Sequence, residues 1–277
     1  SIDTLPFPRA PYTQPRISPD GTMLAAQVRN PIGGWEVLLM DLVTGVRRRV
    51  PVEGNYRPFP ASWLPSGREL MIGTWDPVQF LNYGARIQSL ETGQWRDISL
   101  LGASYMTIDP AGERFIFSDW RTGDLYLRSL GEDTTRVRIA ARGITGSFSP
   151  DGKWASWGGV DGGVAVSPVP PTGAIYPVVE RGQMPLWTPD GTGLIYRDGS
   201  RYYRVPIATT NGFRVGRPVL LAEGPFLSTF AWNHDIAPDG RVLVLLGSRD
   251  QDARTLGVIT NFPRTVERVA QANLRTR

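Results

Sequence analysis

The sequence predicts an all-β fold, a six-bladed β-propeller of four-stranded antiparallel blades, from three observations. A short motif recurs six times, in which an apolar residue is followed after one position by Pro-x-Gly. A short apolar run follows each copy, which is typical of a β-strand. Glycine (31) and proline (24) are frequent among the 277 residues, as expected of a chain with many turns. The prolines of the six copies are Pro19, Pro65, Pro110, Pro150, Pro189 and Pro238, which are 46, 45, 40, 39 and 49 residues apart.

Each copy of the motif predicts a tight turn between two strands. Proline fixes φ at the second turn position, aspartate accepts hydrogen bonds from nearby amides, and glycine adopts the conformation in which the strand resumes. A third strand follows in each unit, for example at Val37–Leu42, and a turn such as Thr44-Gly45 leads to a fourth, for example at Val46–Val52. Four strands at this period describe a propeller blade, whereas a stacked solenoid would have one strand per coil.

The two ends of the chain are expected to complete the ring. The sixth unit lacks a fourth strand, and the segment Ile2–Phe7 is otherwise unassigned. We expect this segment to close the ring as the outer strand of the last blade, where Pro6 is tolerated because an outer strand needs only half of its amides. The tail, residues 263–277, contains a predicted short helix at Thr265–Ala272. The whole chain, residues 1–277, is predicted to form a single propeller domain.

The composition excludes several kinds of functional site. The chain has no cysteine, which excludes disulfides, thiolate metal sites and a cysteine nucleophile. Its single histidine, His234, excludes a multi-histidine metal site and leaves one possible imidazole base. No apolar run approaches the roughly 18 residues of a membrane span. We expect neither a cofactor nor a metal ion to be needed for the fold.

The charge pattern does not favour nucleic-acid binding. The net charge of +4 comes from 30 basic and 26 acidic residues that are mixed along the chain. The one tight basic cluster, Arg47–Arg49, lies between Val46 and Val50 and is predicted to belong to an outer strand, where charge blocks strand addition by other chains. No stripe of basic and aromatic residues accompanies it.

These repeats resemble those of the TolB-type propellers, in which Trp-Ser-Pro-Asp-Gly precedes an apolar strand. The resemblance covers all six units, and Ile17–Gly21 and Phe148–Gly152 carry the Ser-Pro-Asp-Gly core of the motif. Three segments, Pro11–Gly21, Phe213–Leu221 and Leu256–Pro263, resemble a subgroup found as C-terminal propellers of bacterial Ser/Thr kinases and winged-helix regulators. The resemblance implies a propeller outside the cytoplasm that binds proteins or unidentified signals. It implies no catalytic residues, because the residues of the motif are structural.

Two groups of polar residues are candidates for chemistry. Aspartates recur in the loops opposite the Pro-x-Gly turns, at Asp76, Asp119, Asp161, Asp198 and Asp250. Converging carboxylates would suit a hard cation such as calcium, and the alternative is that aspartate is common wherever a turn begins. His234 and Asp235 are predicted at the channel mouth, where His234 would be a general base. The alternative is a structural role, since neighbours in a strand point to opposite sides and no Gly-x-Ser-x-Gly elbow is present.

Aromatic residues in the same loops are candidates for binding a protein. The segment Trp75–Tyr83 is predicted to be the longest of these loops, and it carries three aromatic residues. Exposed aromatic residues on one face are typical anchors of a protein interface, whereas the alternative is that they fold back over the blades and plug the channel. The predicted partner-binding residues are Trp35, Trp75, Phe80, Tyr83 and Trp120, with Arg57, Arg86 and Arg121 beside them.

The sequence and the resemblance together lead us to expect a non-enzymatic protein-binding or scaffolding propeller on the extracytoplasmic side, docked on a membrane protein assembly. One alternative is the ligand-sensing domain of a receptor-type Ser/Thr kinase or regulator. The other is a propeller hydrolase or lactonase, which the single histidine and the absence of cysteine disfavour.

Overall fold

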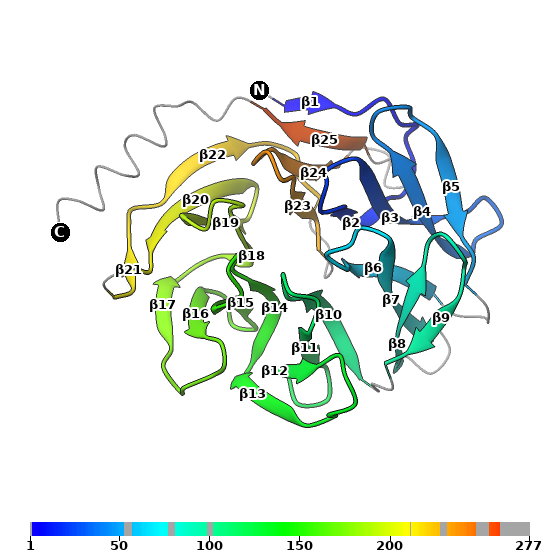
Figure 1. Cartoon of the computed structure of the whole chain (residues 1–277). Coiled ribbons are helices and arrows are strands. Elements are labelled where there is room, and N and C mark those ends of the chain that lie inside the picture. The colour runs from blue at the N-terminus through cyan, green and yellow to red at the C-terminus, as the bar shows by residue number, and fades with distance from the viewer. Residues whose placement is uncertain are drawn as a thin grey trace.

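The computed structural model describes residues 2–52, 57–76, 81–98, 102–210, 212–227, 232–247 and 255–260, without the side chains of residues 81–83. Within this part of the chain there are 25 strands in six antiparallel sheets and no helix. The sheets stand like blades around a common axis, each with the strand before its Pro-x-Gly turn innermost (Figure 1). The structure therefore confirms the predicted six-bladed propeller. The predicted helix Thr265–Ala272 and the tail, residues 263–277, lie outside the described residues.

The blades are numbered in chain order. Blade one contains β2 (Thr13–Ile17), β3 (Met23–Arg29), β4 (Trp35–Asp41) and β5 (Arg47–Val50). Blade two contains β6 (Arg57–Trp63), β7 (Glu69–Asp76), β8 (Leu81–Ser89) and β9 (Trp95–Asp97). Blade three contains β10 (Ala103–Ile108), β11 (Arg114–Asp119), β12 (Asp124–Ser129) and β13 (Arg136–Ala140).

The other three blades follow the same plan with differences at their outer edges. Blade four contains β14 (Gly143–Phe148), β15 (Trp154–Gly159), β16 (Val164–Pro168) and β17 (Tyr176–Val179). Blade five contains β18 (Gln183–Trp187), β19 (Gly193–Asp198), β20 (Arg201–Ala208), β21 (Arg214–Val215) and β22 (Val219–Glu223). Blade six contains β23 (His234–Ile236), β24 (Val242–Leu246), β25 (Thr255–Ile259) and β1 (Ile2–Thr4).

The N-terminal strand closes the ring as predicted. β1 pairs antiparallel with β25, so that Ile2 lies opposite Ile259 and Thr4 opposite Gly257. The side chain of Thr260 also donates a hydrogen bond of 2.8 Å to Asp3. Strand pairing ends at Thr4, earlier than the predicted Phe7, although the Leu5 amide still bonds to the Leu256 carbonyl. Because β1 covers the edge of β25, the last blade contains strands from both ends of the chain.

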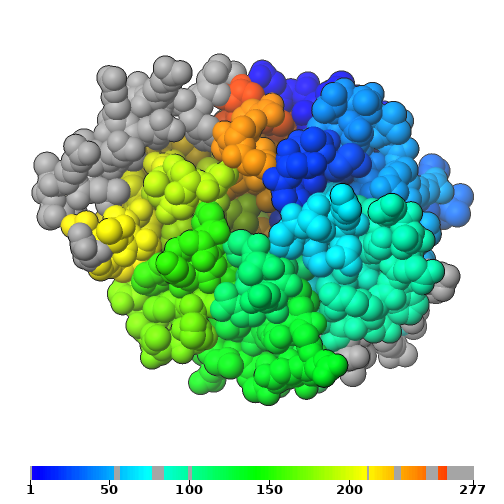
Figure 2. All heavy atoms as spheres, viewed as in Figure 1, coloured from blue at the N-terminus to red at the C-terminus, as the bar shows by residue number. Residues whose placement is uncertain are grey.

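The core consists of six apolar clusters in the described part of the chain, one at each junction between neighbouring blades. Strand β7 shows how a blade serves two of them. Leu70 and Ile72 pack against blade one, whereas Met71, which points to the other side of the sheet, packs against blade three. Both faces of a blade are therefore buried, and the space-filling view shows neighbouring blades in contact from blade one round to blade five (Figure 2).

The Pro-x-Gly turns also join neighbouring blades. Each motif glycine is in the left-handed region, and in five blades the space beside its Cα is bounded by the proline of the preceding blade. A Cβ placed on Gly112 would lie 3.2 Å from the Pro65 ring, whereas one placed on Gly240 of blade six would meet nothing within 4 Å. The motif thus fixes a turn and, in blades one to five, fits it against its neighbour.

The innermost strands depart from regular geometry in a way that the sequence did not predict. Pairing of the first with the second strand shifts register in blades one to five, so each of these inner strands contains a bulge. At four of the bulges a non-glycine residue takes a left-handed φ near 50°, namely Gln14, Tyr105, Thr145 and Met184. Such conformations are uncommon for residues with a side chain, and here they bend the innermost strands of the blades.

Candidate functional site

The predicted binding residues belong to the loop rim, which we define as the end of the ring opposite the Pro-x-Gly turns. In the described part of the chain, the loops between second and third strands form it at residues 30–34, 120–123, 160–163 and 199–200. In blade two, Trp75 and Asp76 end β7, and Trp75 pairs with Asn82 of β8. The expected nine-residue loop Trp75–Tyr83 is therefore wrong, because strands extend from both sides and only residues 77–80 connect them.

Three of the predicted residues come together between blades one and two. The guanidinium carbon of Arg57 lies 3.7 Å from the ring centroid of Trp35 and 5.6 Å from that of Trp75. We call this group the Trp35–Arg57–Trp75 cluster. All three side chains are partly exposed. Stacking of a guanidinium on an aromatic ring contributes about 0.5–2 kcal/mol to holding the two side chains together. The cluster is therefore already formed in the free protein.

A buried amide fixes the position of this cluster. The side chain of Gln27, which is buried, accepts hydrogen bonds from Arg57 at 3.3 Å and from Thr13 at 2.7 Å. Its amide nitrogen donates to the Pro58 carbonyl at 2.7 Å. Strand β3 of blade one thus holds the first residues of β6 in blade two. Gln27 cannot be singled out from the sequence, since its role depends on Arg57, a neighbour 30 residues away.

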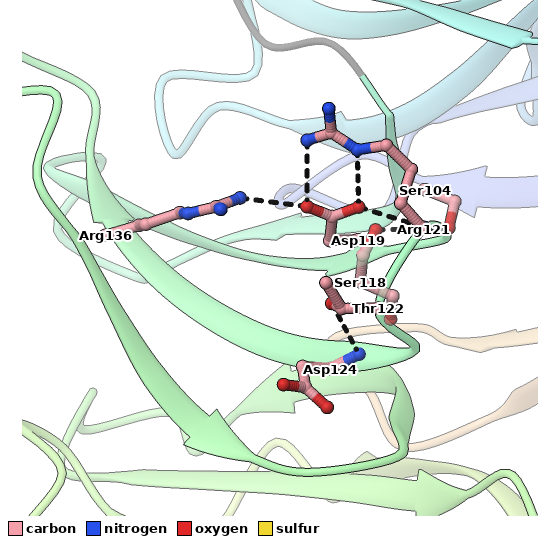
Figure 3. A network of polar contacts seen from close by, with 7 residues as sticks. All are labelled: Ser104, Ser118, Asp119, Arg121, Thr122, Asp124 and Arg136. Atoms are coloured by element: carbon pink, nitrogen blue, oxygen red, sulfur yellow. Dashed lines mark hydrogen bonds and ion pairs between the residues drawn. The ribbon is translucent and has the colours of Figure 1, made fainter.

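Blade three contributes a second part of the rim. Trp120 is 47% exposed, and the next residue, Arg121, makes two hydrogen bonds of 3.1 Å to the carboxylate of Asp119 (Figure 3). Arg136 of β13 donates to the same carboxylate at 2.9 Å. Burial by itself would raise the pKa of Asp119, but the hydrogen bonds from Arg121 and Arg136 hold this pKa below its usual range. Arg121 is therefore held in place by an ionised carboxylate.

The remaining predicted binding residues are placed differently. Arg86 is only 7% exposed, because it lies in the middle of β8 with its guanidinium 5.2 Å from the Trp95 ring. The expectation that Arg86 borders an exposed surface is wrong, since blades cover both faces of this strand. Phe80 lies outside the described residues, and for Tyr83 only the strand position is described.

Two exposed apolar residues of the loop rim were missed by the sequence analysis. Ile32 of blade one is 94% exposed and Val160 of blade four is 46% exposed. Each occupies a loop between a second and a third strand, as Trp120 does. The signal in the sequence was a single apolar residue among turn-forming residues, in Pro31–Gly34 and in Gly159–Gly163. These residues extend the apolar part of the rim across several blades.

His234 lies inside the protein and not at the channel mouth, whereas Asp235 is partly exposed. His234 is fully buried, and its ring stands at 73° to that of Tyr202, with 5.0 Å between centroids. The Asp235 carboxylate faces blade one, where it accepts the Ile17 amide at 2.7 Å. The two side chains thus point to opposite sides of β23, as strand alternation predicts. Without exposure, the imidazole cannot reach a substrate as a general base.

Burial also decides the charge of these two residues. Burial, followed by the positive charges of Arg16 and Arg197, lowers the pKa of His234 to about 3. The carbonyl of Met184 acts weakly in the opposite direction, but neither imidazole nitrogen has a hydrogen bond of good geometry. Burial raises the pKa of Asp235, against the lowering effect of Arg16. His234 is therefore neutral at pH 7.

The acidic loop residues do not converge in the described part of the structure. Asp119 accepts hydrogen bonds from Arg121 and Arg136, and Asp161 pairs with Arg142 at 2.7 Å. Asp250 lies outside the described residues. Among the residues that are described, no three His, Asp or Glu side chains are grouped so that they would hold a metal ion. Nor does this part of the chain contain a helix long and apolar enough to cross a membrane.

Comparison with known proteins finds similar folds but no matching sequence family. No protein-family model matches the sequence, and no curated protein matches it. Among solved structures, the β-propeller domain of Myceliophteria thermophila Cps50 (Swd1) aligns with a TM-score of 0.65 and 13% identity, over 93% of this chain and 98% of that one. A putative TolB from Agrobacterium tumefaciens aligns with a TM-score of 0.62 and 14% identity, over 94% of this chain and 97% of that one. An oligogalacturonate lyase in complex with manganese aligns with a TM-score of 0.61 and 13% identity, over 94% of this chain and 91% of that one. At these identities the likeness shows the propeller fold alone, and a shared fold does not imply a shared function.

Proposed function

We propose that this protein is a non-catalytic propeller that binds a protein partner on the loop rim of blades one to three. The Trp35–Arg57–Trp75 cluster is the observation that carries the proposal. It presents two aromatic rings and a guanidinium at the surface, and the buried Gln27 holds it before any partner arrives. Tryptophan and arginine are the residue types most enriched at the energetic centres of interfaces.

Further residues support an extended interface around this cluster. Ile32 and Trp120 are exposed on loops of the flanking blades. Apolar residues that are exposed singly need no explanation, but several on one rim of a rigid ring can contact one partner together. A non-catalytic role is supported by the burial of the only histidine.

The kind of partner and its location are inferred from the resemblance of the repeats. We propose that the chain belongs with the Pro-Asp-Gly propellers of the TolB type, acts on the extracytoplasmic side, and docks on a membrane protein assembly. Separation of cell fractions tests the location: recovery of the protein with the cytoplasm would contradict it. A sensing domain or a hydrolase remains an alternative class, and neither has a specific observation in its favour.

The binding proposal is tested with rim variants that should fold normally. A partner is first captured by crosslinking in cells that encode the chain, then purified, and its affinity for the propeller is measured by calorimetry. Ile32→Asp and Trp120→Ala should each weaken binding about tenfold or more, because hot-spot truncations cost about 2 kcal/mol or more. Val43→Asp is the control, since Val43 is 81% exposed on a turn at the opposite end of the ring. Equal binding by all three variants and the parent would refute the assignment of the rim.

A further inference from the structure

A cavity of about 390 Å³ lies between blades four and five, at the end of the ring that carries the Pro-x-Gly turns. It is therefore distant from the loop rim, and no part of the proposed protein-binding function uses it. Apolar rings and aliphatic groups form much of its wall, including Trp154, Trp187 and Pro206. Asp151, Asp190 and Arg204 add polar groups. Its volume falls at the lower end of the range for small-molecule sites, which is about 300–1,000 Å³.

The cavity exists because blade five has an unusual outer edge. Its third strand, β20, pairs with β21 near its end and with β22 near its beginning. The outer strand is thus split, and Ala208 at the end of β20, together with Thr209 and Thr210 that follow it, forms one wall of the cavity. Phe213 from the same hairpin packs on Trp154 and Tyr176 of blade four, with ring centroids 5.2 and 4.6 Å apart. This extension is specific to blade five among the described blades.

One carboxylate oxygen in the cavity wall, Oδ2 of Asp151, is available to accept a hydrogen bond. In the turns of blades one and five, the threonine two residues after the aspartate donates to its outer carboxylate oxygen, as Thr192 does to Asp190 at 2.8 Å. Blade four has Lys153 at this position, and Asp151 is bonded through Oδ1 alone, to Ser149 and to the Lys153 amide. In the described part of the chain, Oδ2 of Asp151 has no hydrogen-bond donor.

A buried donor in the cavity wall is also unsatisfied. Trp187 is 6% exposed, and its indole nitrogen has no hydrogen-bond partner. Trp63 occupies the same position of the motif in blade two, and its indole donates to the Arg16 carbonyl of the preceding blade at 2.9 Å. Native proteins satisfy nearly all buried polar groups, so each exception calls for an explanation. Trp187 lines the cavity, but its indole nitrogen is shielded from solvent, so the cavity is bordered by the ring and not by the N–H.

The donors and acceptors exclude two classes of ligand. A cage for an organic cation needs open space between aromatic rings, but Trp154, Tyr176 and Phe213 are packed directly against one another, and Arg204 would repel a cation. An anion would meet two carboxylates and a single guanidinium. The wall offers apolar ring surface together with separate donors and acceptors, which suits a ligand whose hydroxyl groups both donate and accept.

We propose that the cavity between blades four and five binds a neutral mono- or disaccharide. The C–H face of a sugar ring packs on the apolar wall, one hydroxyl donates to Oδ2 of Asp151, and others accept from Arg204, which is positioned by a 2.7 Å hydrogen bond to Thr192. The protein would then have two sites, one at each end of the ring.

Calorimetric titration with named sugars tests this proposal. We expect at least one of maltose, cellobiose and N,N′-diacetylchitobiose to bind with a Kd of about 1 mM or tighter. Asp151→Asn should weaken binding about tenfold, because it removes a charge-assisted hydrogen bond. The matched control is Asp20→Asn, which changes the same turn position in blade one, away from the cavity. Thr209→Trp fills the cavity from its wall and should abolish binding, whereas Thr44→Trp, in a turn of blade one, should not.

Three results would overturn the proposal. The first is that none of the three sugars binds at about 20 mM, a concentration at which even weak sites are occupied. The second is that digalacturonate or tetramethylammonium binds more tightly than every neutral sugar. The third is that Asp151→Asn and Asp20→Asn bind the sugar equally well. Since the rim variants are not involved, none of these results bears on the proposed protein-binding function.

Discussion

Lowering the pH from 7 to 5.5 is expected to destabilise this protein chiefly through His234. The sequence contains one histidine and no cysteine, so no other side chain has an ordinary pKa in this interval. In the folded protein His234 is fully buried, and burial together with Arg16 and Arg197 lowers its pKa to about 3. In the unfolded chain its pKa is near 6.5. The unfolded state therefore takes up a proton as the pH falls through 6.5, while the folded state does not.

The sign and size of the effect follow from this difference. A group whose pKa is lower in the folded state contributes stability that is present above pH 6.5 and is lost progressively down to about pH 3. Where the unfolded chain is protonated at His234 and the folded protein is not, the free energy of unfolding falls by about 1.4 kcal/mol for each pH unit. Between pH 7 and 5.5, where the unfolded state is only partly protonated at first, the expected loss is about 1.2 kcal/mol.

Urea denaturation at pH 7 and at pH 5.5 measures this loss. His234→Leu is the control, because leucine fills a similar volume and does not titrate. Asp235, whose pKa is raised by burial, is present in both proteins, and so its contribution cancels in the comparison. The parent should lose about 1.2 kcal/mol more than the variant over this interval. Parallel behaviour of parent and variant would show that the folded protein binds the proton as readily as the unfolded chain, and the description of His234 as buried and neutral would be wrong.

Three further predictions concern stability and are checked by denaturation. Tyr202→Phe should raise the free energy of unfolding by about 1 kcal/mol, because it removes a buried hydroxyl that has no hydrogen-bond partner, and a decrease would mean that the hydroxyl is bonded. Gly112→Ala should be more destabilising than Gly240→Ala, since both have a positive φ but only the Cβ at 112 meets a proline ring, and equal losses would contradict this. Deleting residues 1–7 should lower the melting temperature and promote aggregation by exposing the edge of β25, whereas a deletion variant that melts like the parent would refute ring closure as a source of stability.

The fold could be predicted from the sequence because its signal is local and repeated. A Pro-x-Gly turn needs only four neighbouring residues, and six copies at similar spacing predict six similar units. Closure by the N-terminal strand could be predicted as well, since the sixth unit had no fourth strand and the segment Ile2–Phe7 belonged to no other unit. The bulges of the inner strands were not predictable, because Gln14, Tyr105, Thr145 and Met184 share no residue type that favours a left-handed conformation.

The candidate site was less predictable, because burial in a propeller depends on neighbouring blades. Alternation along a strand separates an exposed from a buried face only where one face is open to solvent. In β8, Ala85, Arg86 and Ile87 are all buried, since blades cover both faces. His234 was misplaced for the same reason. The stacking of Arg57 on Trp35 and Trp75 joins residues from two blades, and the sequence indicated their proximity on one rim but not their contact.

In the described part of the chain, buried polar atoms without hydrogen-bond partners gather where blades five, six and one meet. Tyr202, Trp232 and His234 pack on one another at this junction, Arg16 lies 4.5 Å from the Trp232 ring, and each of the four has a buried polar atom without a hydrogen-bond partner. The motif glycine of blade six, Gly240, also lacks the proline contact that the other five blades have. Each unsatisfied polar group costs about 1–3 kcal/mol, so this junction is less stable than one satisfied throughout. The pH dependence of His234 and the gain expected from Tyr202→Phe have this same origin, and the two measurements test one physical cause by independent routes.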